Sequence, residues 1–327
     1  MAGLGFMLPH LSVEDIIVSV STNDEIQHEH DHDSQEEPIR RLRFALILLT
    51  VTVVAEVIGG ILTHSLALLA DAGHVFMDLF AMGISLLAAR LARQPATAVR
   101  TYGWHRAEIL AALINGVLLT GLALSLFMGA AKRIQEPREI LSGPMLIVAV
   151  IGLAVNVVIA LKLHGHHAGD LNVRSAYLHV LGDTGASVGV IAAGVVISFT
   201  QWYVVDGIVS IGIGLLILVG GLRLIGKAGH ILLEGVPGTI SLDAVAEAIR
   251  NVEGVNSVHD VHIWSVCSHI VSLSCHINID PKTPEHHDGV IRRVTEMLWE
   301  NFCIMHPTIQ VEYRICGNDI VSQDMKH

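Results

Sequence analysis

Two apolar segments of the sequence each carry a histidine and an aspartate four residues apart. His74 and Asp78 lie in one segment, and His179 and Asp183 lie in another. On an α-helix this spacing places both side chains on one face, about one turn apart. If the two helices face each other, two imidazoles and two carboxylates form a tetrahedral set that suits zinc or a similar divalent cation. Because ionisable side chains are costly inside a membrane, we interpret both pairs as functional.

A single histidine–aspartate pair could instead stabilise helix packing, but the recurrence of the spacing favours metal binding. Asp71 precedes His74 by one turn, where its carboxylate could orient a metal ligand, relay protons or cap the helix. Glu56 and Asn156 lie in two further apolar segments. They could line the ion pathway, or they could form hydrogen bonds between helices. We expect Asp206, near the start of the last apolar segment, at the membrane interface.

Six apolar segments must position these residues. Hydrophobic residues make up 52% of the 327 residues, charged residues make up 16%, and the mean hydropathy is +0.57. This composition argues against a water-soluble protein. Each segment is close to the ~20 residues that cross a bilayer as a helix. The six segments span approximately residues 44–63, 66–91, 107–131, 144–163, 176–199 and 203–226.

The charges predict the orientation of these helices. Lys and Arg gather before the first segment, between the second and third, between the fourth and fifth, and after the sixth. The positive-inside rule makes this side cytoplasmic, and the even number of spans puts both termini there. The net charge is −11, with nine acids and no Lys or Arg in residues 1–37. Since neither polar end has a basic patch, we expect no nucleic-acid partner.

The C-terminal part has the pattern of a small α+β domain with the element order αββαβ. All four cysteines of the chain lie here without a CxxC pair, which is typical of a reduced, cytoplasmic compartment. His276 is expected on the polar face of the second strand, and Cys275 in the core. The expected elements are a helix over 241–252, strands over 258–265 and 270–279, a helix over 286–302 and a strand over 308–315.

These patterns divide the chain into four parts. We predict a disordered acidic tail over residues 1–39, a six-helix transmembrane domain over 40–228, a cytoplasmic metal-binding domain over 229–316 and a C-terminal tail over 317–327. The run His28–Asp33 alternates histidines with acids. It could collect metal ions, or it could be a solvated acidic tail.

Four motifs make the sequence similar to a known family. It resembles the cation diffusion facilitators, and more closely their zinc-transporting and cobalt–zinc–cadmium-resistance branch, over roughly residues 40–316. The motifs are Ser65-Leu66-Ala67-Leu68-Leu69-Ala70-Asp71-Ala72-Gly73-His74 with Asp78, Tyr102-Gly103-Trp104-His105-Arg106-Ala107-Glu108, His179 with Asp183, and His259-Asp260-Val261-His262-Ile263-Trp264.

The resemblance implies a homodimer of six-helix subunits with a ferredoxin-like cytoplasmic domain, exchanging metal for protons. It implies that the four His and Asp residues of the two pairs bind the transported ion. A histidine at position 74, rather than an aspartate, resembles the members that prefer zinc to cadmium or manganese. In the cytoplasmic domain the matching metal ligands are His259, His276, His306 and Glu312, with His262 as an additional candidate. The alternative is a set of solvated histidines at strand ends.

The expected function is proton-coupled zinc efflux by alternating access, with zinc ions, protons, the bilayer and a second copy of the chain as partners. Zinc needs neutral histidine and ionised aspartate, so protons compete for the same ligands, and a reference pKa near 6.5 puts imidazole in the physiological range. Many eukaryotic relatives have a long His-rich loop between spans four and five. The short segment here favours a prokaryotic source and the cell inner membrane.

The sequence argues against two other functions, an intramembrane enzyme and a metal sensor. A membrane-embedded metallohydrolase would keep an open metal position and a general base, whereas two matched pairs fill four positions and the sequence has no HExxH. A metal sensor would need a signalling motif, and no kinase or DNA-binding motif is present. We therefore expect a transporter and no enzyme.

Overall fold

The computed structural model describes the backbone of residues 32–164, 171–279 and 287–313, and the side chains of 46–159, 161, 182–279 and 287–313. The chain divides into two units, residues 1–45 and 46–327. All residues of the candidate sites lie in the second unit. The predicted C-terminal tail and most of the run His28–Asp33 lie outside the described residues.

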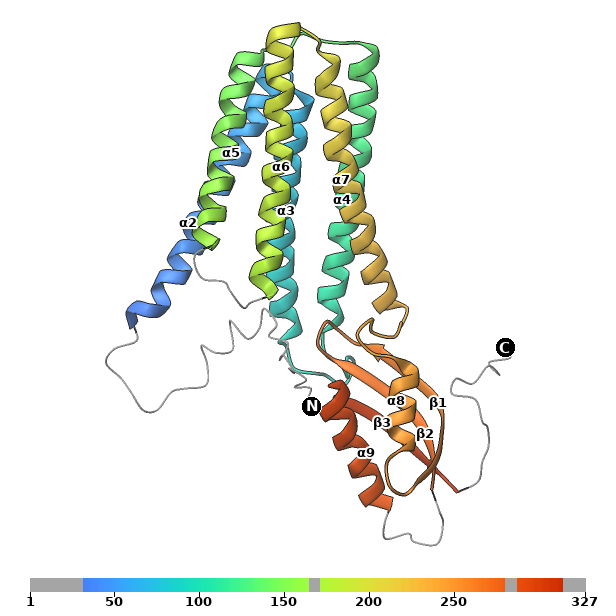
Figure 1. The fold of residues 1–327 in the computed structure, drawn as a ribbon. Helices are drawn as coiled ribbons and strands as arrows, with labels where there is room; N and C mark the ends of the chain where they lie inside the picture. The colour runs from blue at the N-terminus through green and yellow to red at the C-terminus, as the bar shows by residue number, and fades with distance from the viewer. Residues whose placement is uncertain (1–31, 165–170, 280–286, 314–327) are drawn as a thin grey trace, which may run out of the picture. The chain divides into compact units, whose positions relative to one another are not determined.

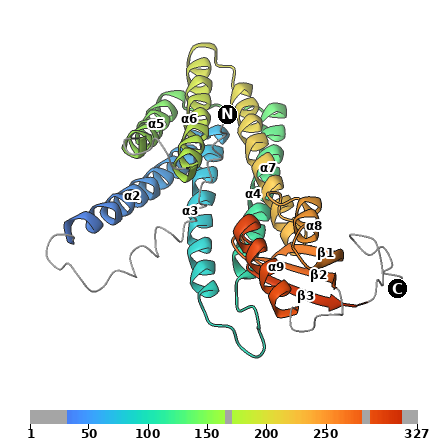
Figure 2. The same ribbon diagram turned by 60° about the horizontal axis from the view of Figure 1, so that its bottom comes forward.

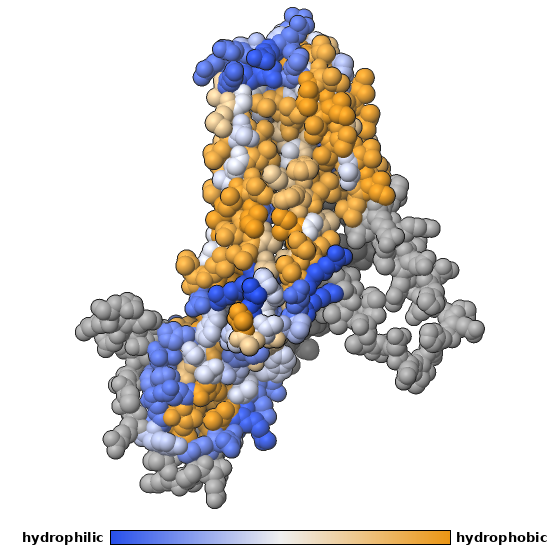
Figure 3. All heavy atoms as spheres, turned by 180° about the vertical axis from the view of Figure 1, so that it is seen from behind, coloured by the Kyte–Doolittle hydropathy of each residue, from blue (hydrophilic) through white to orange (hydrophobic). Residues whose placement is uncertain are grey.

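Six long helices form the first part of the fold (Figure 1). Each contains a stretch long and apolar enough to cross a membrane, which confirms the predicted spans. Leucine, isoleucine, valine and phenylalanine side chains remain exposed along them, and Figure 3 shows this apolar surface on one face. The helices are α2 (His32–Thr63), α3 (Leu66–Ala92), α4 (Arg106–Gln135), α5 (Ser142–His164), α6 (Leu171–Thr200) and α7 (Val204–Leu232).

Helix α2 begins earlier than the sequence predicted. Its first residue is His32, whereas residues 1–39 are predicted to be a disordered tail.

The helices pack in pairs and around α3. Helix α4 runs along α7, α5 runs along α6, and α3 contacts α4, α6 and α7 (Figure 1). At the crossing of α4 and α7, Gly116 and Gly221 face each other: a Cβ at either glycine would lie 3.0 Å from the carbonyl oxygen of the other. Glycine at both positions therefore permits the close approach of these two helices.

Asp206 makes a helix contact that the sequence analysis did not predict. It lies in the first turn of α7 and is fully buried within the protein. Its carboxylate accepts hydrogen bonds from Ser65 Oγ (2.6 Å), Leu66 N (2.8 Å) and Ala67 N (3.1 Å). The first N–H groups of a helix have no partner within the helix, and a carboxylate at this end satisfies them. Asp206 on α7 thus caps α3, the helix that carries His74 and Asp78.

The second part of the fold is a three-stranded sheet covered by two helices. Strand β1 pairs antiparallel with β2, and β2 pairs parallel with β3, so the predicted mixed sheet and the order αββαβ are confirmed. Side chains of both helices join one apolar core with the sheet, and Figure 2 shows the two helices over it. The elements are α8 (Leu242–Arg250), β1 (Val255–Ser265), β2 (Val271–Ile279), α9 (His287–Phe302) and β3 (His306–Glu312).

Strand β1 is not a regular strand. Its register against β2 shifts between His259 and His262, and Asp260 has a φ of +50°. A β-bulge of this kind inserts a residue and changes which side chains face the core. In a regular strand, Val258 and Val261 would point to opposite faces of the sheet. With the bulge between them, both are buried in the same core. The bulge thereby leaves His259 and His262 outside the apolar core.

Candidate metal sites

The first site lies between α3 and α6, within the membrane-spanning part. His74 Nε2 lies 3.0 Å from Asp183 Oδ1 and 3.7 Å from Asp78 Oδ2. One ligand atom from each of the three residues lies within 4.8 Å of the other two. The structure thus brings three of the four predicted ligands together. One imidazole and two carboxylates are a suitable partial ligand set for zinc.

The fourth predicted ligand, His179, lies four residues before Asp183 on α6. Its side chain lies outside the described residues. Its assignment as a ligand therefore stays a prediction from the helical spacing.

A second layer of polar residues lies one helical turn from this cluster. Ser187 Oγ donates a 2.9 Å hydrogen bond to Asp71 Oδ2, so α3 and α6 interact at two successive turns. Asp71 and Glu56 are each 2% exposed, and Asn156 is also buried. Among the described residues, Asp71 Oδ1 and Glu56 Oε2 have no hydrogen-bond partner. Such unsatisfied carboxylate oxygens are rare in buried positions and call for a functional explanation.

Gly152 of α5 makes room for Glu56 of α2. A Cβ at this position would collide with Glu56 Oε1. Asn156 follows Gly152 by one turn on the same helix. A buried carboxyl group and a buried amide thus lie at the contact between α2 and α5. From the sequence, Glu56 and Asn156 could be identified only as separate polar residues.

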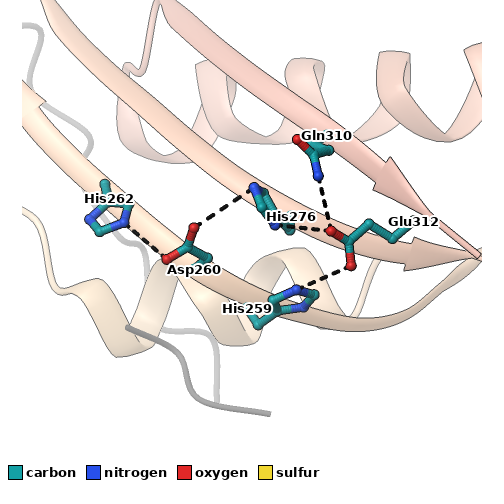
Figure 4. A network of polar contacts seen from close by, with 6 residues as sticks. All are labelled: His259, Asp260, His262, His276, Gln310 and Glu312. Carbon is teal, nitrogen blue, oxygen red and sulfur yellow. Dashed lines mark hydrogen bonds and ion pairs between the residues drawn. The ribbon is translucent and has the colours of Figure 1, made fainter. Parts of the chain in front are cut away.

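The second site lies on the three-stranded sheet of the C-terminal part (Figure 4). His259 and His276 are direct partners across β1 and β2, and their ring centroids are 5.3 Å apart. Glu312 of β3 reaches both, with Oε2 3.3 Å from His259 Nε2 and Oε1 3.1 Å from His276 Nδ1. The side chains of His259 and Glu312 are only 8% and 13% exposed. Strand pairing thus collects two imidazoles and a carboxylate from three strands.

Asp260 extends this cluster and was not singled out as a site residue from the sequence. Figure 4 shows its carboxylate between two imidazoles. Oδ1 lies 3.1 Å from His262 Nε2, and Oδ2 lies 3.8 Å from His276 Nε2. A carboxylate behind a metal-binding histidine orients the ring and fixes its tautomer. The signal in the sequence was the broken alternation Val258-His259-Asp260-Val261-His262, which marks the bulge.

His306 is not brought to this cluster. It opens β3 opposite Ser272, six residues before Glu312, so about 20 Å of strand separates the two. Its ring contacts Tyr102, with 6.5 Å between the ring centroids. Cys275 points into the core, where burial raises the pKa of its thiol to about 12. This thiol stays protonated at neutral pH and is a poor metal ligand.

Two family models match most of the chain. Residues 42–233 match the family model of the cation efflux transmembrane domain, and residues 237–314 match that of the cation efflux protein cytoplasmic domain. A solved structure of the metal-bound C-terminal domain of the CzcD transporter from Cupriavidus metallidurans is 36% identical in sequence. It covers 22% of this chain and 99% of its own, with a TM-score of 0.21.

Several curated proteins are similar over most of their length. The zinc transporter ZitB of Pectobacterium atrosepticum is 40% identical over 86% of this chain and 87% of its own. The metal cation efflux system protein CzcD of Cupriavidus metallidurans is 41% identical over 85% and 87%. A cadmium, cobalt and zinc/H(+)-K(+) antiporter of Bacillus velezensis is 38% identical over 85% and 90%. The chain therefore belongs to the cation efflux, or cation diffusion facilitator, family, in its zinc, cobalt and cadmium branch.

Proposed function

We propose that this protein exports zinc from the cytoplasm in exchange for protons. The observation that carries the proposal is the cluster of His74, Asp78 and Asp183, which joins two membrane-spanning helices through zinc-binding side chains. A resident structural zinc would need no such position inside the bilayer, where charged ligands are costly. The names of relatives as zinc transporters and as an antiporter support the same function.

The transported ion would be bound by the cluster together with His179. Two histidines and two aspartates complete a four-coordinate zinc site. The ligands come from α3 and α6 only, so a relative movement of these helices changes the geometry of the whole site. Alternating access then requires one rearrangement at this contact to open the site to either side.

Exchange for protons follows from the ligand chemistry. Zinc binds neutral imidazole and ionised carboxylate, so protons taken up by the same groups release the metal. We assign Asp71, Glu56 and Asn156 to the pathway next to the site, because they are buried polar groups on three of the surrounding helices. A proton from the outer side would displace zinc there, and release of that proton to the cytoplasm would restore the site.

The cytoplasmic cluster would hold a resident zinc ion. His259, His276 and Glu312 supply the nitrogen and oxygen donors that zinc binds, and the side chains of His259 and Glu312 are almost buried. Asp260 would orient His276 from behind. We further propose a homodimer in the cell inner membrane, with both termini cytoplasmic.

The test is zinc flux in sealed proteoliposomes with an imposed pH gradient. Wild-type protein should move zinc against protons, and Asp183→Asn should reduce the rate by about 100-fold, because a ligand should matter at least as much as the groups that orient one (~10–100-fold). Asp243→Asn, an exposed residue of α8, is the matched control and should transport normally.

Two results would contradict the proposal. One is zinc binding without any movement across the membrane in the wild type. The other is normal transport by Asp183→Asn in vesicles where the control variant is equally well incorporated.

A further inference from the structure

We propose a third metal site, formed by Glu108, Cys267 and His269. A carboxylate oxygen, a thiol sulfur and an imidazole nitrogen of these residues all lie within 4.8 Å of one another. Glu108 lies in the first turn of α4. Cys267 and His269 lie in the connection between β1 and β2, residues 266–270. The three residues thus combine a transmembrane helix with the cytoplasmic sheet, and the site is separate from the two described above.

A backbone hydrogen bond closes the connection that carries Cys267 and His269. Val266 N donates a 2.8 Å hydrogen bond to Ile270 O and closes the hairpin. Cys267 is fully buried and is not part of a disulfide, while His269 and Glu108 are half-buried. A second contact joins the same two parts of the chain, because Tyr102, shortly before α4, lies against His306 at the start of β3. The contact between Tyr102 and His306 therefore supports the approach of Glu108 to the hairpin.

The ligand types set the chemistry of this site. Sulfur, nitrogen and oxygen donors in one cluster are suited to zinc, and the thiolate favours softer ions. The two other clusters contain no cysteine among their described residues. The third site should therefore prefer cadmium and cobalt over magnesium or manganese more strongly than the other two. Three protein ligands leave a fourth position for water.

A metal ion at this position would connect the start of α4 to the β1–β2 hairpin. Because α4 packs along α7 over its length, the connection would hold the cytoplasmic sheet to this helix pair. The site would thus make the link between the two parts of the chain dependent on cytoplasmic metal. This inference does not rest on transport, and it holds or fails whether or not zinc crosses the membrane.

Cobalt binding by the full-length protein tests the site, because a thiolate ligand adds a sulfur-to-cobalt charge-transfer band in the near ultraviolet. We expect this band in the wild type and in Cys303→Ser, whose cysteine is exposed directly after α9, and its loss in Cys267→Ser. Zinc-loaded protein should show a zinc–sulfur distance of about 2.3 Å by X-ray absorption, again only while Cys267 is present.

Glu108→Gln and His269→Gln keep the cysteine and guard against a folding defect in Cys267→Ser. Each should weaken cobalt binding at the charge-transfer band by about 10-fold or more, with the remaining cobalt bands unchanged. Hydrogen exchange of residues 266–270 should slow on addition of zinc to the wild type but not to Glu108→Gln. Cobalt binding without a sulfur band, or a band that persists in Cys267→Ser, would overturn the proposal.

Discussion

The cluster between α3 and α6 and the cluster on the cytoplasmic sheet use the same ligand types but hold them differently. In the membrane, Asp78 and Asp183 come from two helices that touch through side chains. On the sheet, His259 and His276 are direct partners across two strands that are joined by backbone hydrogen bonds. The first arrangement can open when the helices shift, whereas the second is fixed by strand register.

The two clusters also differ in the groups that lie beside their ligands. Next to the membrane cluster, Asp71 and Glu56 are buried carboxylates outside the ligand set, and each keeps an oxygen without a hydrogen-bond partner among the described residues. On the sheet, Glu312 Oε2 and His259 Nδ1 also lack such a partner, but Glu312 Oε1 accepts a 3.0 Å hydrogen bond from Gln310 and Asp260 lies beside His276. A site that ions pass through needs neighbours that can change protonation and hydration, and a resident site needs neighbours that hold the ligands still. Ligand identity alone therefore does not separate the two functions.

The largest effect on stability should come from Asp206→Ala, which removes the cap of the helix that carries the membrane cluster. Ser65 Oγ, Leu66 N and Ala67 N would lose their acceptor in a buried position, at a cost of about 3 kcal/mol. The matched variant is Ser241→Ala, which removes the exposed cap of α8 and should cost about 1 kcal/mol. Thermal unfolding of the purified protein in detergent measures both.

Equal melting temperatures for these two variants would contradict the assignment of Asp206 as the cap of α3. Asp206→Asn refines the comparison, because its amide oxygen can still accept one of the three hydrogen bonds. We expect its melting temperature to lie between those of the wild type and Asp206→Ala.

Glu312→Gln should affect the cytoplasmic cluster and leave the membrane cluster intact. Glu312 contacts both histidines, so we expect the zinc affinity of this cluster to fall by about 100-fold, with little change in zinc flux. Equilibrium zinc titration of the full-length protein gives the affinity. Glu300→Gln, exposed at the end of α9, is the control. A collapse of flux in Glu312→Gln would show that the two clusters are not functionally separate.

A smaller effect should follow from Asp260→Asn. Asparagine tolerates the positive φ of this position, so the bulge is retained while the charge behind His276 is lost. We expect about a 10-fold loss of zinc affinity at the cytoplasmic cluster, the lower range for a residue that orients a ligand. An unchanged affinity would mean that Asp260 serves the bulge alone.

Much of this architecture could be predicted from the sequence, because its signals are local. Six apolar segments and the spacing between His74 and Asp78 depend only on helical periodicity, and the structure has both helices and the cluster. The broken alternation around Asp260 signals an irregular strand, but which side chains the bulge brings together depends on how β1 pairs with β2. The burial of Asp206 depends on the packing of α7 against α3, and the hydropathy of the sequence does not indicate which helices pack together.

The cysteine positions show the same limit. Strand alternation correctly placed Cys275 in the core, because the pattern repeats within one element. The approach of Cys267 to Glu108 joins residues more than 150 positions apart in the sequence, and no local pattern encodes it. Contacts of this kind arise only from the arrangement of elements in the folded chain.

The most direct test of the difference between the two clusters is a pair of matched histidine variants in one flux assay. His74→Ala and His259→Ala each remove one imidazole, the first between the membrane helices and the second on the sheet. With both variants reconstituted at equal density under the same pH gradient, His74→Ala should reduce zinc flux to background, and His259→Ala should retain most of it. Equal loss in both variants, or normal flux in His74→Ala, would contradict the assignment of transport to the cluster between α3 and α6.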